Sequence, residues 1–229
     1  MSTPPDAASE RWSLQLWQEI EPTFDLILAH PFVGGLADGS LDPKVFAHYV
    51  EQDVHFLGDY ARALAVVAAK APTLADTAMF ARHSADVFQV ELELHTTLLP
   101  ELGMQPEAVA QVAVAPTTQA YTSYLLATAY GGSFAEGLAA VLPCYWIYAR
   151  VGERLLARGS TDARYQLWID GYGGDEYAAS VAEVLELTDR IGPTLDSSDE
   201  AAARAHFAMT ARYEWLFFDA AYQRETWPV

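Results

Sequence analysis

The sequence predicts an all-α fold, a single-domain bundle of several long helices. Apolar residues recur at helical spacing along nearly the whole chain, and the alternating runs typical of strands are absent. Apolar and aromatic types make up 52% of the 229 residues, which is enough for a sizeable core. No linker and no repeat stands out, so residues 10–229 are expected to form one helical domain. Residues 1–9, which include Pro4 and Pro5, are expected to form a flexible tail.

Local signals mark where the helices start and stop. Asp42 offers a side-chain cap, and Pro43 suits the first helical position after it. Three further starts have the spacing of a capping box, or nearly so: Thr73 with Asp76, Ser133 with Glu136, and Ser197 with Glu200. Stops are expected at Gly103, at Gly131 and Gly132, and at Gly159. The predicted helices span 10–29, 43–70, 74–102, 117–130, 134–157, 175–191 and 198–224, with shorter helical turns near 105–112 and 162–170.

The helix predicted over 134–157 holds the only cysteine of the chain, Cys144. The segment is apolar nearly all round until Arg150, which is typical of a helix in the middle of a domain. Pro143 removes one backbone hydrogen bond and is expected to bend this helix next to Cys144. A lone cysteine rules out an internal disulfide and a cysteine-based zinc cluster. Cys144 is either a small apolar side chain in a core or a nucleophile at the floor of a pocket.

The net charge limits the partners of this protein. Its 31 acidic residues outnumber the 13 Lys and Arg residues and give a formal charge of −18. Such a surface repels phosphate backbones and anionic membranes, so binding to nucleic acid or to a membrane is not expected. The N-terminus has no secretory pattern, and no apolar run is long enough to span a membrane. A soluble, cytoplasmic protein is therefore predicted.

Two carboxylates are embedded in apolar helical faces. Asp53 shares a face with Tyr49 and Phe56, and Glu214 stands between Tyr213 and Trp215. A buried carboxylate must find partners or carry a raised pKa that can serve chemistry, and the sequence leaves both readings open. The other face of the Asp53 helix is expected to be solvated and holds Glu51, His55 and Asp59.

Tyrosines at helical spacing are candidates for a ligand slot, although such residues more often lie in a core. Tyr121 and Tyr124 occur together, Tyr172 precedes two glycines, and Tyr148 follows Cys144 by one helical turn.

A metal site is poorly supported. The Glu-x-x-His motif that helical bundles use for di-iron sites does not occur, and its nearest equivalent is Glu91, Glu93 and His95. His30 before Pro31 is a weak candidate for a haem ligand, and the other histidines are scattered. No metal and no cofactor is therefore expected.

Seven segments together resemble the thiaminase II family, also called TenA, from about Leu16 to Trp227. They are HPFVGGLADGSL, FAHYVEQDVHFL, ELELH, PTTQAYTSYLL, FAEGLAAVLPCYWIYARVGERL, YQLWIDGYGGDEY and YEWLFFDAAYQRETW. The resemblance implies a haem-oxygenase-like helical fold without haem, a homotetramer and no cofactor. It also implies hydrolysis of the C–N bond at the methylene of a 4-amino-2-methylpyrimidine. The substrate is then thiamin or 5-aminomethyl-4-amino-2-methylpyrimidine, and the product is the hydroxymethylpyrimidine used in thiamin salvage.

Position by position, the resemblance implies roles for seven residues. The nucleophile falls on Cys144, which indicates the branch of the family that uses this cysteine. The catalytic carboxylate falls on Glu214, and the carboxylate that binds the amino group and a ring nitrogen falls on Asp53. The remaining four positions would form a stacking and hydrogen-bonding slot: Phe56, Tyr121, Tyr148 and Tyr172. Phe56 stands where many members carry a tyrosine, so one hydroxyl of that slot is missing.

The implied reaction agrees with the chemistry of these side chains. Glu214 with a raised pKa can protonate the ring, Asp53 can orient it, and the Cys144 thiolate can add to it. A free thiol is little ionised at neutral pH, so a neighbouring tyrosine or a proton relay must assist Cys144. Two other hypotheses remain: a non-catalytic pyrimidine-binding or regulatory helical oligomer, and a haem-oxygenase-like oxidase with a metal or quinone-type cofactor.

Overall fold

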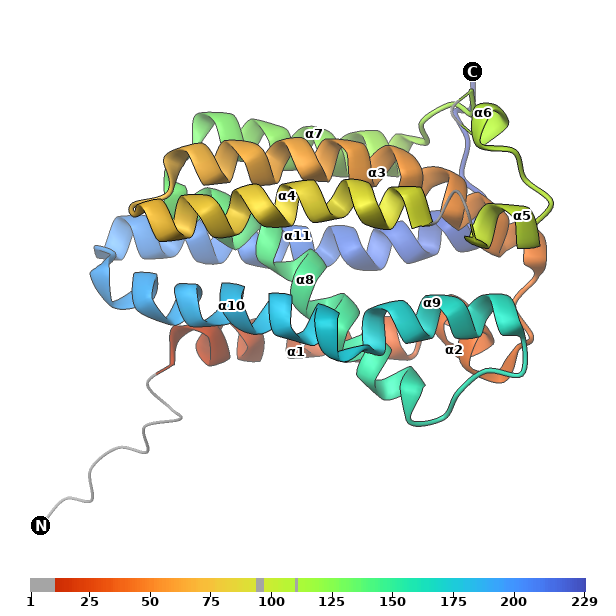
Figure 1. The fold of residues 1–229 in the computed structure, drawn as a ribbon. Helices are drawn as coiled ribbons and strands as arrows, with labels where there is room; N and C mark the ends of the chain where they lie inside the picture. Colours follow the sequence, from red (N-terminus) through yellow and green to blue (C-terminus); the bar gives the residue numbers. More distant parts are fainter. Residues whose placement is uncertain (1–10, 94–96, 110) are drawn as a thin grey trace, which may run out of the picture.

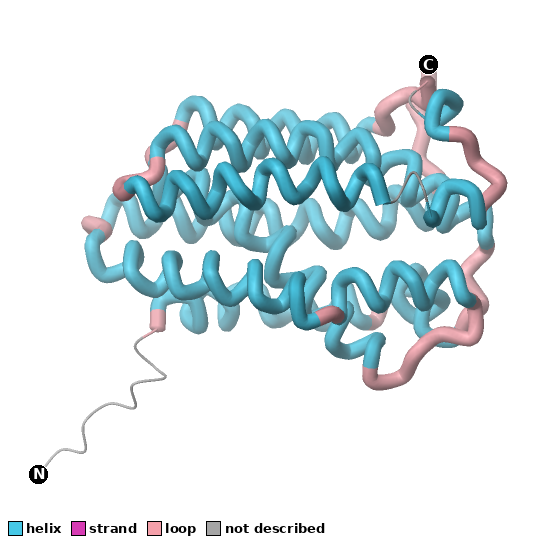
Figure 2. Tube along the Cα trace, viewed as in Figure 1, coloured by secondary structure: helices cyan, strands magenta, loops and turns pink. Residues whose placement is uncertain are grey.

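The computed structural model describes residues 11–93, 97–109 and 111–229, and all its regular elements are helical (Figures 1 and 2). The all-α prediction is confirmed. In chain order the elements are α1 (Trp12–Leu28), α2 (Pro31–Asp38), α3 (Pro43–Lys70), α4 (Leu74–Glu93), α5 (Leu99–Glu101), α6 (Pro106–Val109), α7 (Pro116–Gly131), α8 (Phe134–Leu156), α9 (Ala163–Gly173), α10 (Asp175–Ile191), the 3₁₀ turn η2 (Gly192–Thr194) and α11 (Ser197–Gln223).

Helix α8 is the central element. It runs obliquely between a layer made of α3, α4 and α7 and a second layer made of α1, α9 and α10, and it packs along α11 (Figure 1). A capping box starts it: the Ser133 side chain accepts from the Glu136 amide, and the Glu136 carboxylate accepts from the Ser133 amide. Every residue from 137 to 148 is buried, as the apolar sequence predicts.

The helix stays continuous through Pro143, and two tyrosine hydroxyls bind its backbone on either side of that residue. Tyr60 of α3 donates to the carbonyl oxygen of Val141 at 3.0 Å, and Tyr177 of α10 donates to that of Cys144 at 3.2 Å. Pro143 cannot donate to the carbonyl one turn before it, so this stretch of helix lacks one bond of its own. The two hydroxyls therefore tie the weakened part of α8 to the helices on both sides.

The structure adds one helix that the sequence analysis missed. The segment after His30 forms α2, although the pair Gly34 and Gly35 is typical of a break. A Cβ at Gly35 would lie 3.0 Å from backbone atoms of Leu41, so glycine is needed where the chain folds back onto this helix. Gly39 ends α2 in the left-handed conformation, with a φ of 76°.

Other boundaries also differ from the predictions. One helix was expected over 74–102; within the described residues that span is helical over α4 (Leu74–Glu93) and again over the three-residue α5 (Leu99–Glu101). Residues 94–96 between them lie outside the described part, as does the predicted tail at 1–9. The short turn predicted near 162–170 extends to Gly173 as α9, and the turn near 105–112 is the four-residue α6. No helix in the described ranges is long and apolar enough to cross a bilayer.

Candidate active site

The seven residues that the sequence singled out come from five helices and converge beside α8. Asp53 and Phe56 lie on α3, Tyr121 on α7, Cys144 and Tyr148 on α8, Tyr172 on α9 and Glu214 on α11. All are buried except Tyr172, which is half-buried. The structure therefore brings together side chains that are up to 161 positions apart, from Asp53 to Glu214.

Glu214 is a buried acid that accepts one hydrogen bond from a neighbouring side chain. Its side chain is almost fully enclosed, and the Tyr121 hydroxyl donates to Oε1 at 2.5 Å. Burial raises the pKa of Glu214 to about 8; the Tyr121 hydrogen bond opposes the shift and the charge of Asp53 adds to it. At neutral pH Glu214 is therefore largely protonated and can act as an acid. Its Oε2 atom makes no hydrogen bond to the described residues.

Asp53 is buried without any hydrogen bond to the described part of the chain. The residue is 4% exposed, and burial alone raises the pKa of its carboxyl group to about 7. A buried carboxylate without partners lowers the free energy of unfolding, so the folded protein would be more stable without Asp53 at this position. Such a group is available to accept hydrogen bonds from an amine or a ring N–H of a ligand.

The charges of both acids, Glu214 and Asp53, act on Cys144. Burial raises the pKa of its thiol well above the usual value, and the charges of Glu214 and Asp53 raise it further. The resting group is therefore a thiol, and a nucleophilic role needs a proton acceptor. Tyr148, one turn along α8, makes no hydrogen bond to Cys144 in the described structure; its hydroxyl accepts from Tyr49 at 3.3 Å.

Aromatic rings form the walls around these groups. The Phe56 ring centroid lies 5.0 Å from that of Tyr121, and Tyr121 stacks on Tyr213 at 5.1 Å with 6° between the planes. The rings of Tyr148 on α8 and Tyr172 on α9 are 4.7 Å apart. Rings in this arrangement suit a flat aromatic ligand and exclude water.

Three tyrosines that the sequence analysis did not select surround Cys144. They are Tyr60, Tyr145 and Tyr177, and in each case burial and then the charge of a Cys144 thiolate raise the pKa of the phenol. Tyr60 follows Asp53 and Phe56 by seven and four positions on α3. Extending the stripe of Asp53 and Phe56 by one helical turn would have found it.

Of the candidates for metal binding, His30 has a structural role, and the side chains of the others lie outside the described part. No group of three or more His, Cys, Asp or Glu residues in the described part could hold a metal ion. His30 is the N-cap of α2: its Nδ1 accepts from the Phe32 amide at 3.2 Å, and its Nε2 lies 3.3 Å from Asp219 Oδ1. The side chains of Glu91, Glu93 and His95 lie outside the described part.

The face predicted to be solvated is only partly so. Glu51, His55 and Asp59 are each half-buried, and Nε2 of His55 bonds the carbonyl oxygen of Val112 at 2.9 Å. The prediction is wrong for His55, because the segment before α7 folds over this part of α3.

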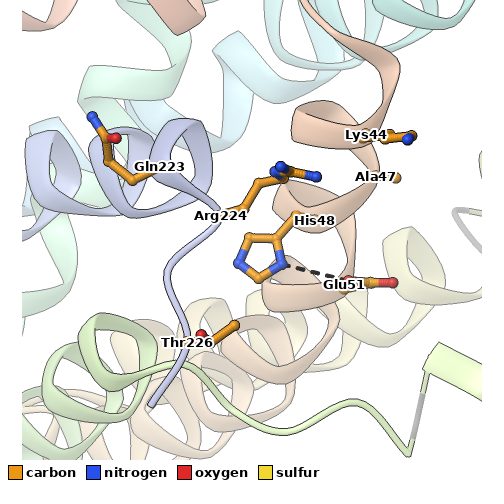
Figure 3. A pocket seen from close by; sticks show the side chains of 7 residues that line it. All are labelled: Lys44, Ala47, His48, Glu51, Gln223, Arg224 and Thr226. Atoms are coloured by element: carbon orange, nitrogen blue, oxygen red, sulfur yellow. Dashed lines mark ion pairs between the residues drawn. The ribbon is translucent and has the colours of Figure 1, made fainter. Parts of the chain in front are cut away.

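A surface hollow of about 530 Å³ lies apart from this cluster, between α3 and the end of α11 (Figure 3). It contains none of the seven predicted site residues; its lining is Lys44, Ala47, His48, Glu51, Gln223, Arg224 and Thr226. His48 Nδ1 lies 3.6 Å from Glu51 Oε2 within it. The hollow offers charges but no thiol and no aromatic walls, so the buried cluster is the candidate active site.

The cluster combines three kinds of reactive group in one aromatic enclosure. Glu214 can donate a proton, Asp53 can accept hydrogen bonds, and Cys144 can act as a nucleophile once its proton is removed. Burial strengthens each of these interactions, because water no longer screens them. The arrangement suits acid-assisted nucleophilic chemistry on a flat, nitrogen-containing ring.

Residues 17–224 match the TENA/THI-4/PQQC family. An aminopyrimidine aminohydrolase of Bacillus subtilis is 35% identical over 198 residues, which cover 86% of this chain and 84% of that protein. A second aminopyrimidine aminohydrolase, from Halalkalibacterium halodurans, is 33% identical over 218 residues, which cover 94% and 97%.

Solved structures agree with these matches. A TenA homologue from Pyrococcus horikoshii OT3 superposes with a TM-score of 0.85 at 30% identity, over 93% of this chain and 99% of that one. A domain with a heme oxygenase-like fold from Shewanella denitrificans superposes with a TM-score of 0.74 at 16% identity, over 92% of both chains. The second likeness establishes the fold class alone.

Proposed function

We propose that this chain, which belongs to the TENA/THI-4/PQQC family, is an aminopyrimidine aminohydrolase of the thiaminase II type. It hydrolyses the C–N bond at the 5-methylene of a 4-amino-2-methylpyrimidine and yields the hydroxymethylpyrimidine for thiamin salvage. One observation carries the proposal: two buried carboxyl groups without an ion-pair partner in the described part lie beside the only cysteine. Their energetic cost is explained if a basic ring occupies the site.

In this proposal Glu214 and Asp53 grip the ring and activate it. Glu214, whose pKa of about 8 keeps it protonated at neutral pH, donates its proton to a ring nitrogen. Asp53 accepts from the exocyclic amine and fixes the orientation of the ring. Phe56 and Tyr121 stack on one side and Tyr148 and Tyr172 enclose the other, so bulk water is excluded.

The covalent steps then run through Cys144. Its sulfur adds to the protonated ring and forms a C–S bond, which pushes electrons toward the methylene and expels ammonia or the thiazole. Water adds to the methylene carbon, and the C–S bond breaks to release the product and the cysteine. The proton removed from Cys144 returns to it when the C–S bond breaks, so the cycle needs no oxidant and no cofactor.

The same proposal includes a cytoplasmic homotetramer. Large apolar side chains are exposed on several helices and offer surface for contacts between subunits: Leu26, Leu74, Phe88 and Tyr130. Size-exclusion chromatography with light scattering gives the subunit number directly.

One observation favours a second candidate, a pyrimidine-binding or regulatory protein without turnover. The pKa of the Cys144 thiol is raised by burial, as expected for an inert cysteine in a core. In that case the ring would bind and stabilise the fold, but nothing would be released.

The first experiment incubates the purified protein with 5-aminomethyl-4-amino-2-methylpyrimidine and follows ammonia release beside the Cys144→Ala variant. We expect release by the wild type, none by the variant, and the same ligand-dependent rise of the thermal midpoint in both. Equal turnover by Cys144→Ala would remove the nucleophile from the proposal. Thermal stabilisation without release from this compound or from thiamin would favour the binding protein.

A further inference from the structure

A chain of hydrogen bonds leads from the protein surface toward Cys144. Glu183 of α10, whose side chain is about half exposed, has its Oε2 atom 3.0 Å from Nε2 of His83 on α4. The Nδ1 atom of His83 lies 3.0 Å from the hydroxyl of Tyr145 on α8. His83 itself is buried, with 3% of its side chain exposed. Three helices therefore contribute one residue each to a continuous polar path through the core.

The partners of His83 fix its tautomer. Glu183 as a carboxylate can only accept, so Nε2 of His83 carries the hydrogen. Nδ1 then has a free lone pair and accepts from the Tyr145 hydroxyl. A neutral histidine held in this way is a base whose acceptor atom is directed at Tyr145.

Several charges act on this histidine. Burial lowers its pKa; Glu183 on α10 and Asp86 on α4 oppose that shift, whereas Arg82 on α4 adds to it. Arg82 also pairs directly with Glu183. Tyr145 is the group that faces His83 from α8. His83 is thus neutral at rest, and the carboxylate of Glu183 stabilises the imidazolium that forms when it takes up a proton.

Tyr60 continues the path from Tyr145 to the cysteine. The ring centroids of Tyr60 and Tyr145 are 5.9 Å apart. Tyr145 follows Cys144 directly in the sequence, and hydrogen bonding to Tyr60 lowers the pKa of both Cys144 and Tyr145 against the larger effect of burial. At rest the Tyr60 hydroxyl donates to the carbonyl oxygen of Val141, so it must turn from Val141 toward Tyr145 when it passes its hydrogen on, and its oxygen then accepts one from the thiol.

We propose that His83 receives the proton of Cys144, passed through the hydroxyls of Tyr60 and Tyr145, when the sulfur attacks the substrate. The S–H bond breaks, each hydroxyl accepts one proton and passes one on, and His83 Nδ1 gains the last. When the C–S bond of the adduct breaks, the protons return along the same path. His83 acts through the two tyrosines and does not touch the substrate. The inference rests on the proposed function, because only a nucleophilic cysteine has to lose its proton.

The test uses the variant His83→Gln and a readout that is independent of turnover. A glutamine can keep both hydrogen bonds, because its oxygen accepts from Tyr145 and its nitrogen donates to Glu183, but it cannot take up a proton. Cys144 is the only cysteine, so the alkylation rate with iodoacetamide, measured across pH, reports on this thiol alone. Thiolate formation is also followed by ultraviolet absorbance.

We expect the thiol of His83→Gln to ionise at a higher pH than in the wild type. Ammonia release should fall at least about tenfold, as when a general base is lost, and the decline of activity at low pH caused by protonated His83 should disappear. Tyr145→Phe interrupts the same path and should match His83→Gln. The double variant of His83 and Tyr145 should release ammonia no more slowly than either single variant, because both changes interrupt the same proton path.

His55→Gln is the matched control, since His55 is a half-buried histidine bonded to a carbonyl oxygen outside the path. It should keep both the thiol titration and the turnover of the wild type. If folded His83→Gln and Tyr145→Phe titrate and turn over like the wild type, the relay is overturned. A wild type that releases no ammonia would instead contradict the proposed function, and the thiol titration would still decide whether His83 accepts the proton.

Discussion

Glu214 and Asp53 show how two buried acids in one site take different roles. Both lack a cation, but Glu214 receives the Tyr121 hydroxyl at one oxygen, whereas Asp53 receives nothing from the described residues. Glu214 has the higher pKa, about 8 against about 7, partly because Asp53 adds its charge. At neutral pH the proton therefore stays on Glu214, and Asp53 is the first of the pair to become an anion.

Replacing Asp53 with asparagine separates these roles. The pKa of Glu214 should fall because the neighbouring charge is gone, so the loss of activity on the alkaline side should begin at a lower pH. KM should rise about 10- to 100-fold, which corresponds to the loss of a hydrogen bond from the neutral exocyclic amine to a charged carboxylate. Steady-state kinetics across pH measures both effects.

Asp59→Asn is the control for this change, because Asp59 lies further along α3 and pairs with Arg62. It should leave KM and the pH profile unchanged. An Asp53→Asn enzyme with wild-type KM would show that this carboxylate does not hold the amine.

The residues found from the sequence were those whose local context was already unusual. Asp53 and Glu214 stood out because a carboxylate among apolar neighbours is costly, and the family resemblance gave them roles. His83 and Tyr145 did not stand out, because their significance depends on a contact between α4 and α8, 62 positions apart. No spacing rule within one helix can reveal such a contact.

At the scale of elements, the approach of α8 to α9 fixes the position of Tyr172. A Cβ at Gly152 of α8 would lie 2.5 Å from the carbonyl carbon of Tyr172 and 2.6 Å from the nitrogen of Gly173. The two backbones are therefore in direct contact, and only glycine allows it. This contact holds the ring of Tyr172 against Tyr148.

The substitution Gly152→Ala should push α9 away from α8. We expect a loss of about 1–3 kcal/mol from overpacking, which lowers the thermal midpoint by about 2–12 °C in a domain of this size. KM should rise as well, because Tyr172 moves with α9. Differential scanning calorimetry and steady-state kinetics measure the two effects.

Gly58→Ala provides the comparison, because a Cβ at Gly58 of α3 meets nothing within 4 Å outside its own helix. That variant should be as stable as the wild type or more stable by up to about 1 kcal/mol, since alanine favours helix. Equal behaviour of the two variants would contradict the role assigned to the contact at Gly152.

The predicted helices were most accurate where a cap and an apolar face agreed. Ser133 and Asp42 mark the starts of α8 and α3, and both helices end within a residue of the expected position. Helix α2 was not predicted, because its pair of glycines is typical of a break, whereas Gly35 serves a close approach to Leu41, which is a tertiary requirement. Helix signals describe a segment in isolation and do not include its neighbours.

At the scale of the whole molecule, the buried acids link the site to stability. In the unfolded chain their pKa values lie near 4, but in the folded protein they are about 7 for Asp53 and about 8 for Glu214. At pH values between the unfolded and the folded pKa of each acid, the folded state binds more protons than the unfolded state. The free energy of unfolding therefore falls as pH rises from about 4 to 8, and it does not fall further because of these groups above that range.

The variant Glu214→Gln should remove much of this dependence, because glutamine fills the same space without titrating. Between pH 5 and pH 9 we expect the wild type to lose on the order of 2–5 kcal/mol more than the variant, so that the inactive variant is the more stable protein at pH 9. Urea unfolding at both pH values measures the difference. Glu153→Gln, an exposed position on α8, should behave like the wild type. Equal losses in Glu214→Gln and wild type would mean that Glu214 is not held protonated in the fold, and the acid assigned to the ring-protonation step would have to be sought elsewhere.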